Sequence, residues 1–270
     1  MTPDRDRILT GLAQIWGEWA DWGSDLSADD WKVASRCPGW TVQDNLAHLV
    51  GTERMLQGGP APEIEVSGDH LKNPIGMVNE RWIESMRAMS GDEVLEAFRV
   101  VSGERLSALH AMDEVEFAVV GPTPVGVAPY GRSMHLRVYD AWLHLEDCRE
   151  PLGHEPSAGG LPAEMSVDEV GTAAGYIIGK KGGAPDGSRV EVTLTGPVEA
   201  TIRVAVDGRA SVVEAFEDGP TATLAMSSHD WLALTGGRKD PVPLIEDGRV
   251  VLGGDLDLAR QLAERLAFTI

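Results

Sequence analysis

The sequence predicts two domains, a bundle of α-helices over residues 1–152 and a smaller α+β domain over residues 153–270. Three observations support this fold class. Apolar residues recur at helical intervals through the first half, which is the spacing of amphipathic helices. The segment 189–206 instead alternates polar and apolar residues, as antiparallel strands do. The change in pattern falls near Pro151-Leu152-Gly153, where a proline and a glycine break both kinds of element.

The first half contains four or five predicted helices. The second of them starts after the Pro38-Gly39 turn, because Thr41 is a good N-cap and Asp44 supplies the acidic partner of a capping box. A Gly/Pro-rich stretch at 121–131 is predicted to be a loop. The predicted helices cover residues 4–22, 42–56, 74–90, 92–112 and 132–149. Short connections between helices of this length indicate an up-and-down bundle.

The second half alternates strands and helices. Two antiparallel strands are predicted within 189–206, on either side of a Gly-Pro turn, and Ser227 and Ser228 are candidate N-caps for a short helix. Further strands are predicted at 210–216, 221–225 and 249–254, and helices at 227–237 and 256–267.

Composition limits the possible partners. The formal charge is −20, and a surface this acidic repels nucleic-acid phosphates and anionic lipid. No run of about 18 apolar residues is present, so we expect no membrane span. The N-terminal residues lack the apolar core of a signal peptide. Two cysteines, Cys37 and Cys148, give no disulfide framework, and we expect a cytoplasmic protein.

A candidate metal site stands out on two of the predicted helices. Asp140 and His144 are four residues apart, so they lie on the same helix face and can reach one ion. His48, on the second helix, can supply a third ligand if the two helices pack together. Three protein ligands that leave a coordination position open are typical of a catalytic metal site.

The same residues have a structural interpretation. A lone histidine is commonly a packing residue, and a carboxylate four residues before a histidine can simply stabilise a helix. Trp40, Trp142 and Cys148 are expected to be packing residues. The remaining histidines lack partners at ligand spacing and are expected at the surface or at helix ends; they are His70, His110, His135, His154 and His229.

Two motifs resemble a known family. The string CPGWTVQDNLAHL, followed by RVYDAWLHLEDCR, is similar to the mycothiol-dependent maleylpyruvate isomerases within the DinB-like superfamily of metal-dependent thiol transferases. The end of the chain, from ATLAMSSHDWLALTGGRKD onward, resembles a sterol-carrier-protein-2-like (SCP2-like) domain. The resemblance implies a DinB-like four-helix bundle followed by an SCP2-like α+β domain.

The resemblance also implies a site. The family's metal ligands fall on His48, Asp140 and His144, the ion would be Zn²⁺ or another divalent metal, and mycothiol would be the thiol cosubstrate. The isomerases are expected to have glutamate where this chain has Asp140. An aspartate is one methylene shorter, so this departure bears on the substrate more than on the metal.

Three charged residues have possible supporting roles. From its position, Asp147 could accept the second N–H of His144, or could be a solvated acidic residue. Arg137 could orient Asp140, or could form an ordinary helix pair. Arg238 matches the position where the family's small domain supplies an arginine, which could bind a substrate carboxylate; its alternative is a solvated loop arginine.

The leading functional prediction is a zinc-dependent enzyme that uses a low-molecular-weight thiol on a small electrophile, either as an S-transferase or as a maleylpyruvate-type cis-trans isomerase. We expect a monomer. A non-enzymatic protein that binds a lipid or other small molecule through the SCP2-like domain is the first alternative. A hydrolase that uses the metal to activate water is the second.

Overall fold

A computed structural model describes residues 4–124 and 126–269. The chain divides into two compact units, Met1–Ser157 and Ala158–Ile270. The first consists of helices and one short hairpin, and the second of a sheet with helices, so the predicted fold class is confirmed. Among the described residues, no helix is both long enough and apolar enough to cross a membrane.

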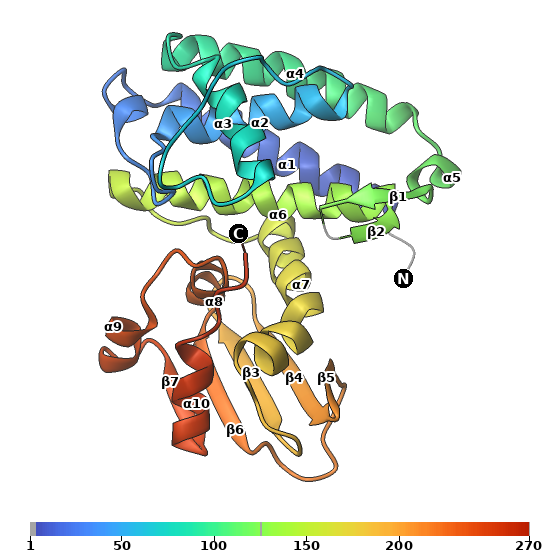
Figure 1. Cartoon of the computed structure of the whole chain (residues 1–270), viewed down its shortest axis with the longest axis vertical. Helices are drawn as coiled ribbons and strands as arrows, with labels where there is room; N and C mark the ends of the chain where they lie inside the picture. The colour runs from blue at the N-terminus through green and yellow to red at the C-terminus, as the bar shows by residue number, and fades with distance from the viewer. Residues whose placement is uncertain (1–3, 125, 270) are drawn as a thin grey trace. The chain divides into compact units, whose positions relative to one another are not determined.

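Four long helices, α1, α2, α4 and α6, pack around one apolar core in the first unit (Figure 1). The core is dominated by large side chains such as Trp19, Leu46, Phe98 and Trp142, each no more than 2% exposed. The elements of this unit are α1 (Arg5–Ser24), η1 (Asp30–Lys32), α2 (Val42–Leu56), α3 (Pro74–Glu84), α4 (Gly91–Ala111), α5 (Glu114–Phe117), β1 (Val120–Thr123), β2 (Gly126–Pro129), α6 (Tyr130–Arg149) and η2 (Glu150–Leu152).

The start of α2 is fixed by the predicted capping box. Thr41 accepts a hydrogen bond from the Asp44 amide, and the Asp44 side chain accepts one from the Thr41 amide. Each satisfies an amide that the first turn of a helix leaves without a partner. One turn before its end, α2 has Gly51, where a Cβ atom would lie 2.4 Å from Trp82 on α3. Glycine therefore allows α3 to pack directly against the helix that carries His48.

Two predictions for this unit were wrong in detail. The stretch predicted as a loop at 121–131 contains a two-stranded antiparallel hairpin, in which Val120 pairs with Pro129. Proline is tolerated there because each strand has only one neighbour and leaves its other edge unpaired. The helix predicted at 74–90 ends at Glu84, where the Ser85 hydroxyl bonds back to the Trp82 carbonyl and the chain continues as turns.

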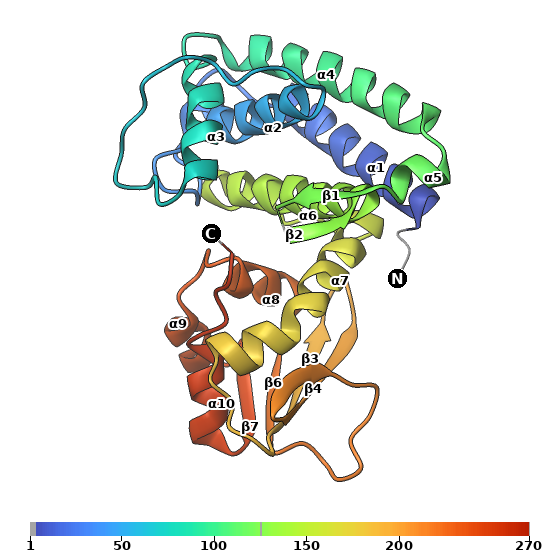
Figure 2. The same cartoon turned by 45° about the vertical axis from the view of Figure 1, so that its right-hand side comes forward.

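The second unit is a five-stranded sheet in the order β5-β4-β3-β6-β7. Figure 2 shows α7 and α10 lying across it. Alternate residues of the inner strands are buried, such as Val190, Val192 and Leu194 on β3, so the helices cover one face. The elements are α7 (Leu161–Gly175), η3 (Tyr176–Lys181), β3 (Arg189–Thr195), β4 (Ala200–Asp207), β5 (Arg209–Val212), β6 (Ala222–Ser227), α8 (Ser228–Thr235), α9 (Pro241–Glu246), β7 (Val251–Gly254) and α10 (Leu256–Ala263).

The predicted strand pair within 189–206 is confirmed as antiparallel β3 and β4, and Ser227 caps α8 as predicted. Helices α7 and α9 were not predicted. Both begin with a proline in the first turn, a position that favours helix initiation. The apolar residues of α7 do not follow a single stripe, so its sequence lacks the periodicity of an amphipathic helix. The last helix, α10, ends at Ala263, four residues before the predicted 267.

Candidate metal site

The three predicted ligands converge between α2 and α6. His48 Nε2 lies 3.3 Å from Asp140 Oδ2, and His144 Nε2 lies 3.8 Å from Asp140 Oδ1. One ligand atom from each residue falls within 4.8 Å of the others. His48 is 4% and His144 7% exposed, because α2 packs against α6 and covers both imidazoles.

Trp40, in the turn before α2, covers both imidazoles. The ring centroid of Trp40 lies 5.3 Å from that of His48 and 5.8 Å from that of His144. Trp40 is held in place by the hydrogen bond that its indole N–H donates to Glu80, at 2.9 Å. The predicted packing residue therefore packs on the site itself.

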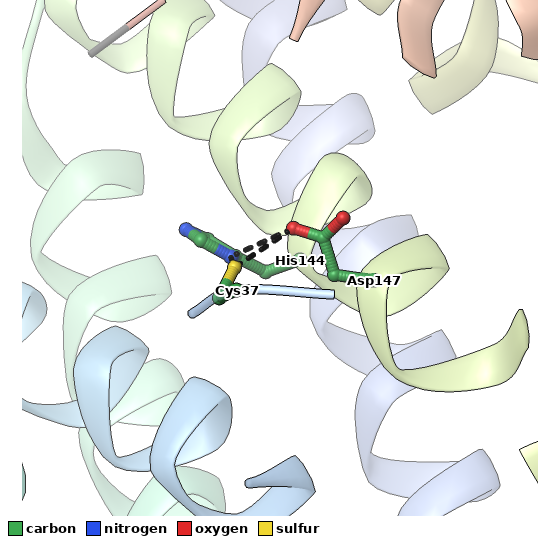
Figure 3. Close-up of side chains that lie close together, drawn as sticks. All are labelled: Cys37, His144 and Asp147. Carbon is green, nitrogen blue, oxygen red and sulfur yellow. Dashed lines mark hydrogen bonds and ion pairs between the residues drawn. The ribbon is translucent and has the colours of Figure 1, made fainter. Parts of the chain in front are cut away.

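The other edge of His144 faces a second group of buried side chains (Figure 3). Its Nδ1 lies 3.4 Å from Asp147 Oδ2 and 3.5 Å from the Cys37 sulfur, while the Cys37 thiol donates to Asp147 Oδ2 at 3.1 Å. Asp147 is fully buried, and its Oδ1 pairs with Arg36 Nε at 3.2 Å. The solvated alternative for Asp147 is therefore wrong, since its carboxylate lies against the imidazole.

Arg137 connects Asp140 to a buried ion network. Its Nη1 pairs with Asp140 Oδ2, and its Nε pairs with Glu53 Oε1 at 2.8 Å. Arg105 holds the other Glu53 oxygen through Nε at 2.9 Å and reaches the Tyr130 hydroxyl with Nη2 at 2.8 Å. Because Glu53, Arg105 and Arg137 are each at least 93% buried, this network fixes the helix face on which Asp140 stands.

The charges around the site keep Asp140 ionised. Burial raises the pKa of Asp140, but the Arg137 guanidinium and the two imidazoles outweigh it and hold that pKa well below its usual range. Burial lowers the pKa of His48. Burial also acts to lower the pKa of His144, but the Cys37 sulfur and Asp147 outweigh it and raise that pKa to about 10. Asp140 thus keeps a negative charge that attracts a cation.

The donor set fits a divalent metal. Two imidazole nitrogens and one carboxylate oxygen are ligands that zinc accepts. A carboxylate beside the outer nitrogen of a ligand histidine, as Asp147 is beside His144, recurs in metal sites because it fixes the ring's tautomer and orientation.

Arg238 belongs to the second unit, in the turn after α8. It is half-buried, and its Nη1 donates to the Gly236 carbonyl at 2.7 Å. His154 lies at the surface as predicted, where it accepts from the Trp22 indole at 3.0 Å. His70 is half-buried and pairs with buried Glu80 at 3.1 Å.

Sequence reasoning missed the parts that Glu53 and Cys37 play. Glu53 lies in α2 five residues after His48, and a charged residue on the inward side of a predicted helix is the signal that could have identified it. Cys37 lies in the CPGW turn of the same motif as His48, but nothing in the linear sequence brings it to His144, which is 107 residues away.

Two family models match the sequence. Residues 12–149, just over half of the chain, match the mycothiol maleylpyruvate isomerase N-terminal domain. Residues 184–267 match the SCP-2 sterol transfer family.

Similar structures and sequences agree with this. A crystal structure of the mycothiol-dependent maleylpyruvate isomerase, and one of a point variant of it, each align with a TM-score of 0.56 at 17% identity, covering 92% of both chains; this likeness concerns the fold. An uncharacterised protein of Mycobacterium tuberculosis, recorded from two strains, is 30% identical over 132 residues. The match covers 47% of this chain and 49% of the relative, so the chain spans about half the length of the curated relatives it matches.

Proposed function

The chain belongs to the mycothiol maleylpyruvate isomerase family, and we propose that it is a metal-dependent enzyme that uses mycothiol to act on a small electrophile. The observation that carries this proposal is the convergence of His48, Asp140 and His144, whose ligand atoms lie within 4.8 Å of one another. Membership of the family supports the thiol, and the nitrogen and oxygen donors support zinc.

His48, Asp140 and His144 would hold the metal. A divalent metal with an open position stabilises a thiol in its thiolate form near neutral pH, which prepares the sulfur to attack an electrophilic carbon. The protein's own residues set the geometry. Asp147 keeps the outer nitrogen of His144 as the N–H tautomer, so that Nε2 is free to coordinate, and Arg137 holds the Asp140 carboxylate toward the two imidazoles. Trp40 covers the rings and limits the access of water to them.

The outcome after thiol addition defines the reaction type. In an isomerisation, addition turns a cis double bond into a single bond, the bond rotates, and elimination of the thiol restores a trans double bond. In a transfer, the adduct leaves as the product. Both outcomes share the same first step, so both remain in the proposal.

We assign Arg238 to a carboxylate of the substrate, on the strength of its position in the family's pattern. A guanidinium suits this task because it binds a carboxylate through two parallel hydrogen bonds. The Arg238→Lys variant keeps the charge but loses this geometry, so its KM should rise for electrophiles that carry a carboxylate and stay unchanged for those that lack one.

The test combines elemental analysis with a thiol-dependence assay. The purified protein should contain about one equivalent of metal, and it should consume a panel of conjugated alkenes, including maleylpyruvate, only when mycothiol is present. His48→Ala and His144→Ala should each lose the activity, and the double variant should contain no metal. Full thiol-dependent activity in the metal-free double variant would contradict the proposal.

A second candidate function rests on the SCP-2 match over residues 184–267. The second unit has a surface hollow of about 480 Å³ whose apolar wall includes Ile245, Val250 and Leu252, with Arg260 at its edge. Such a hollow suits a small amphipathic molecule. Native mass spectrometry distinguishes the two candidates, because a carrier protein would retain a lipid and hold no metal. We place either function in the cytoplasm, with the protein acting as a monomer. Neither Cys37 nor Cys148 forms a disulfide, in keeping with a reducing compartment.

A further inference from the structure

A second set of metal-ligating atoms lies on the outer edge of His144, and the function proposed above does not use it to hold an ion. The set consists of Cys37 Sγ, His144 Nδ1 and Asp147 Oδ2 (Figure 3). We propose that these three atoms form a second metal site, for a thiophilic divalent ion of the size of zinc, which shares His144 with the first site.

The spacing of the three atoms matches a tetrahedral ion. Bonds of about 2.3 Å to sulfur and about 2.0–2.2 Å to nitrogen or oxygen, at tetrahedral angles, separate neighbouring ligand atoms by about 3.3–3.7 Å. The observed separations are 3.1 Å from Sγ to Oδ2, 3.5 Å from Sγ to Nδ1 and 3.4 Å from Nδ1 to Oδ2. An ion therefore fits after a shift of a few tenths of an ångström.

The site is preorganised by its surroundings. Asp147 is fully buried, and because Arg36 Nε occupies its Oδ1 at 3.2 Å, the carboxylate presents Oδ2 to the other two ligands. Cys37 is 6% and His144 7% exposed. Fixed and nearly dry ligands lose little conformational entropy when they bind an ion.

The chemistry of the set differs from that of the first site. On binding, the thiol proton leaves to solvent and the sulfur coordinates as thiolate. The second set then offers two anionic ligands, one of them sulfur, whereas His48, Asp140 and His144 offer one carboxylate and two neutral nitrogens. Thiolate selects zinc-class and softer ions over harder ones such as Mn²⁺ and Mg²⁺.

The shared histidine makes the two sites compete. A neutral imidazole carries one lone pair and one N–H, so an ion on Nδ1 leaves Nε2 protonated and takes His144 away from the first site. A thiophilic ion would then inactivate the first site without contacting His48 or Asp140. This inference does not depend on the first site being filled.

Cobalt titration tests the second site directly. Co²⁺ bound through a cysteine thiolate gives a sulfur-to-cobalt charge-transfer band in the near ultraviolet, which nitrogen and oxygen ligands do not produce. The first site is removed by His48→Ala and, in a separate variant, by Asp140→Asn, with circular dichroism to confirm that each folds. Both variants should bind one Co²⁺ and show the band, because Cys37, His144 and Asp147 are intact.

Two cysteine variants complete the design. Adding Cys37→Ser to either background should abolish the band and weaken Co²⁺ binding by at least about tenfold. Cys148→Ser is the matched control, since Cys148 is the other buried thiol, and it should leave both unchanged. The proposal is overturned if both backgrounds bind Co²⁺ without the band, if neither binds Co²⁺, or if the band survives Cys37→Ser and disappears with Cys148→Ser.

Discussion

His144 shows how one side chain is specified by contacts on opposite edges of its ring. Its Nε2 faces Asp140 at 3.8 Å, and its Nδ1 faces Asp147 at 3.4 Å. In its neutral form, the form that binds a metal, an imidazole that donates Nδ1–H to a carboxylate presents the lone pair of Nε2 on its other side. The orientation of the proposed ligand therefore depends on a residue that would not touch an ion in the first site.

Asp147→Asn tests this dependence. The amide cannot supply the carboxylate's charge, so we expect zinc affinity to fall by about 10- to 100-fold, measured by competition with a chromogenic chelator. Glu150→Gln is the matched control, because Glu150 pairs with the same Arg36, at 2.7 Å, but on the exposed side. Equal zinc affinities for Asp147→Asn and the unaltered protein would show that Asp147 has no influence on the metal.

For single residues, contacts within one helix could be predicted from the sequence, but contacts between segments far apart in the sequence could not. Asp140 and His144 share one helix, so their meeting could be predicted from a spacing of four. His48 was predicted as the third ligand on the condition that its helix packs against theirs, and the resemblance to a family supported that prediction. No local pattern predicts the contacts of Cys37, because its neighbours His144 and Asp147 are brought to it by the packing of the turn against α6.

At the scale of elements, three helices are joined by one buried carboxylate. Glu53 on α2 accepts from Arg105 on α4 and from Arg137 on α6. Burying two guanidinium groups and one carboxylate is costly, but it is tolerated here because each Glu53 oxygen pairs with its own arginine. Removing the centre of this network leaves two buried guanidinium groups facing each other.

We expect Glu53→Ala to lower the free energy of unfolding by about 3–5 kcal/mol, the typical cost of breaking a buried ion pair, as measured by urea denaturation. Glu53→Gln keeps the shape and should lose less. The control is Glu104→Ala, on an exposed position of α4, which should change the free energy by no more than about 0.5 kcal/mol. A small effect of Glu53→Ala would mean that water replaces the lost carboxylate.

Glu80 on α3 ties Trp40 and His70 to this helix, together with Arg87. Burial raises the pKa of Glu80, but the hydrogen bonds from His70 and Trp40 and the charge of Arg87 outweigh it and lower that pKa. A carboxyl group whose pKa is lower in the folded state stabilises the fold above its unfolded pKa, about 4.3, and loses that contribution as the pH falls through the folded value.

Glu80→Gln should therefore destabilise the protein by about 1–3 kcal/mol at pH 7, and the difference from the unaltered protein should shrink as the pH falls below about 4. Thermal unfolding across this range measures the effect. Glu84→Gln, which removes a more exposed partner of the same Arg87, should cost less than about 1 kcal/mol at every pH. A pH-independent difference for Glu80→Gln would show that the charge is irrelevant.

Elements were predictable where a local rule decides the structure. The capping box at Thr41 and the strand pair around residue 196 follow from turn and cap chemistry, and both are present. The hairpin at 120–129 was not predicted because its glycines and prolines favour a loop, and helix α7 was not predicted because its apolar residues form no single stripe. In both places proline occupies a position that costs little, an open strand edge or the first turn of a helix.

At the scale of the whole molecule, metal binding and stability are linked. An ion that binds the folded state alone adds RT ln(1 + [L]/Kd) to the free energy of unfolding, about 2.7 kcal/mol at one hundred times the Kd. We expect zinc to raise the midpoint of the unfolding transition of the first unit, seen by calorimetry, and to leave that of His144→Ala unchanged, because both proposed metal sites use His144. An equal shift in both proteins would indicate binding elsewhere, for instance on a surface whose formal charge is −20.

The turn that precedes α2 also sets a limit on how this protein can vary. Cys37 contacts His144 and Trp40 contacts His48, and both lie just before Thr41, the N-cap of α2. An added or deleted residue in this short segment would therefore move the thiol or the indole away from its imidazole. Insertions and deletions should be accepted readily in the long connection at 57–73 and rejected between 37 and 41. A library of single-residue insertions within 37–41 and within 57–73, scored for zinc content, should show loss of zinc in the first segment and retention in the second.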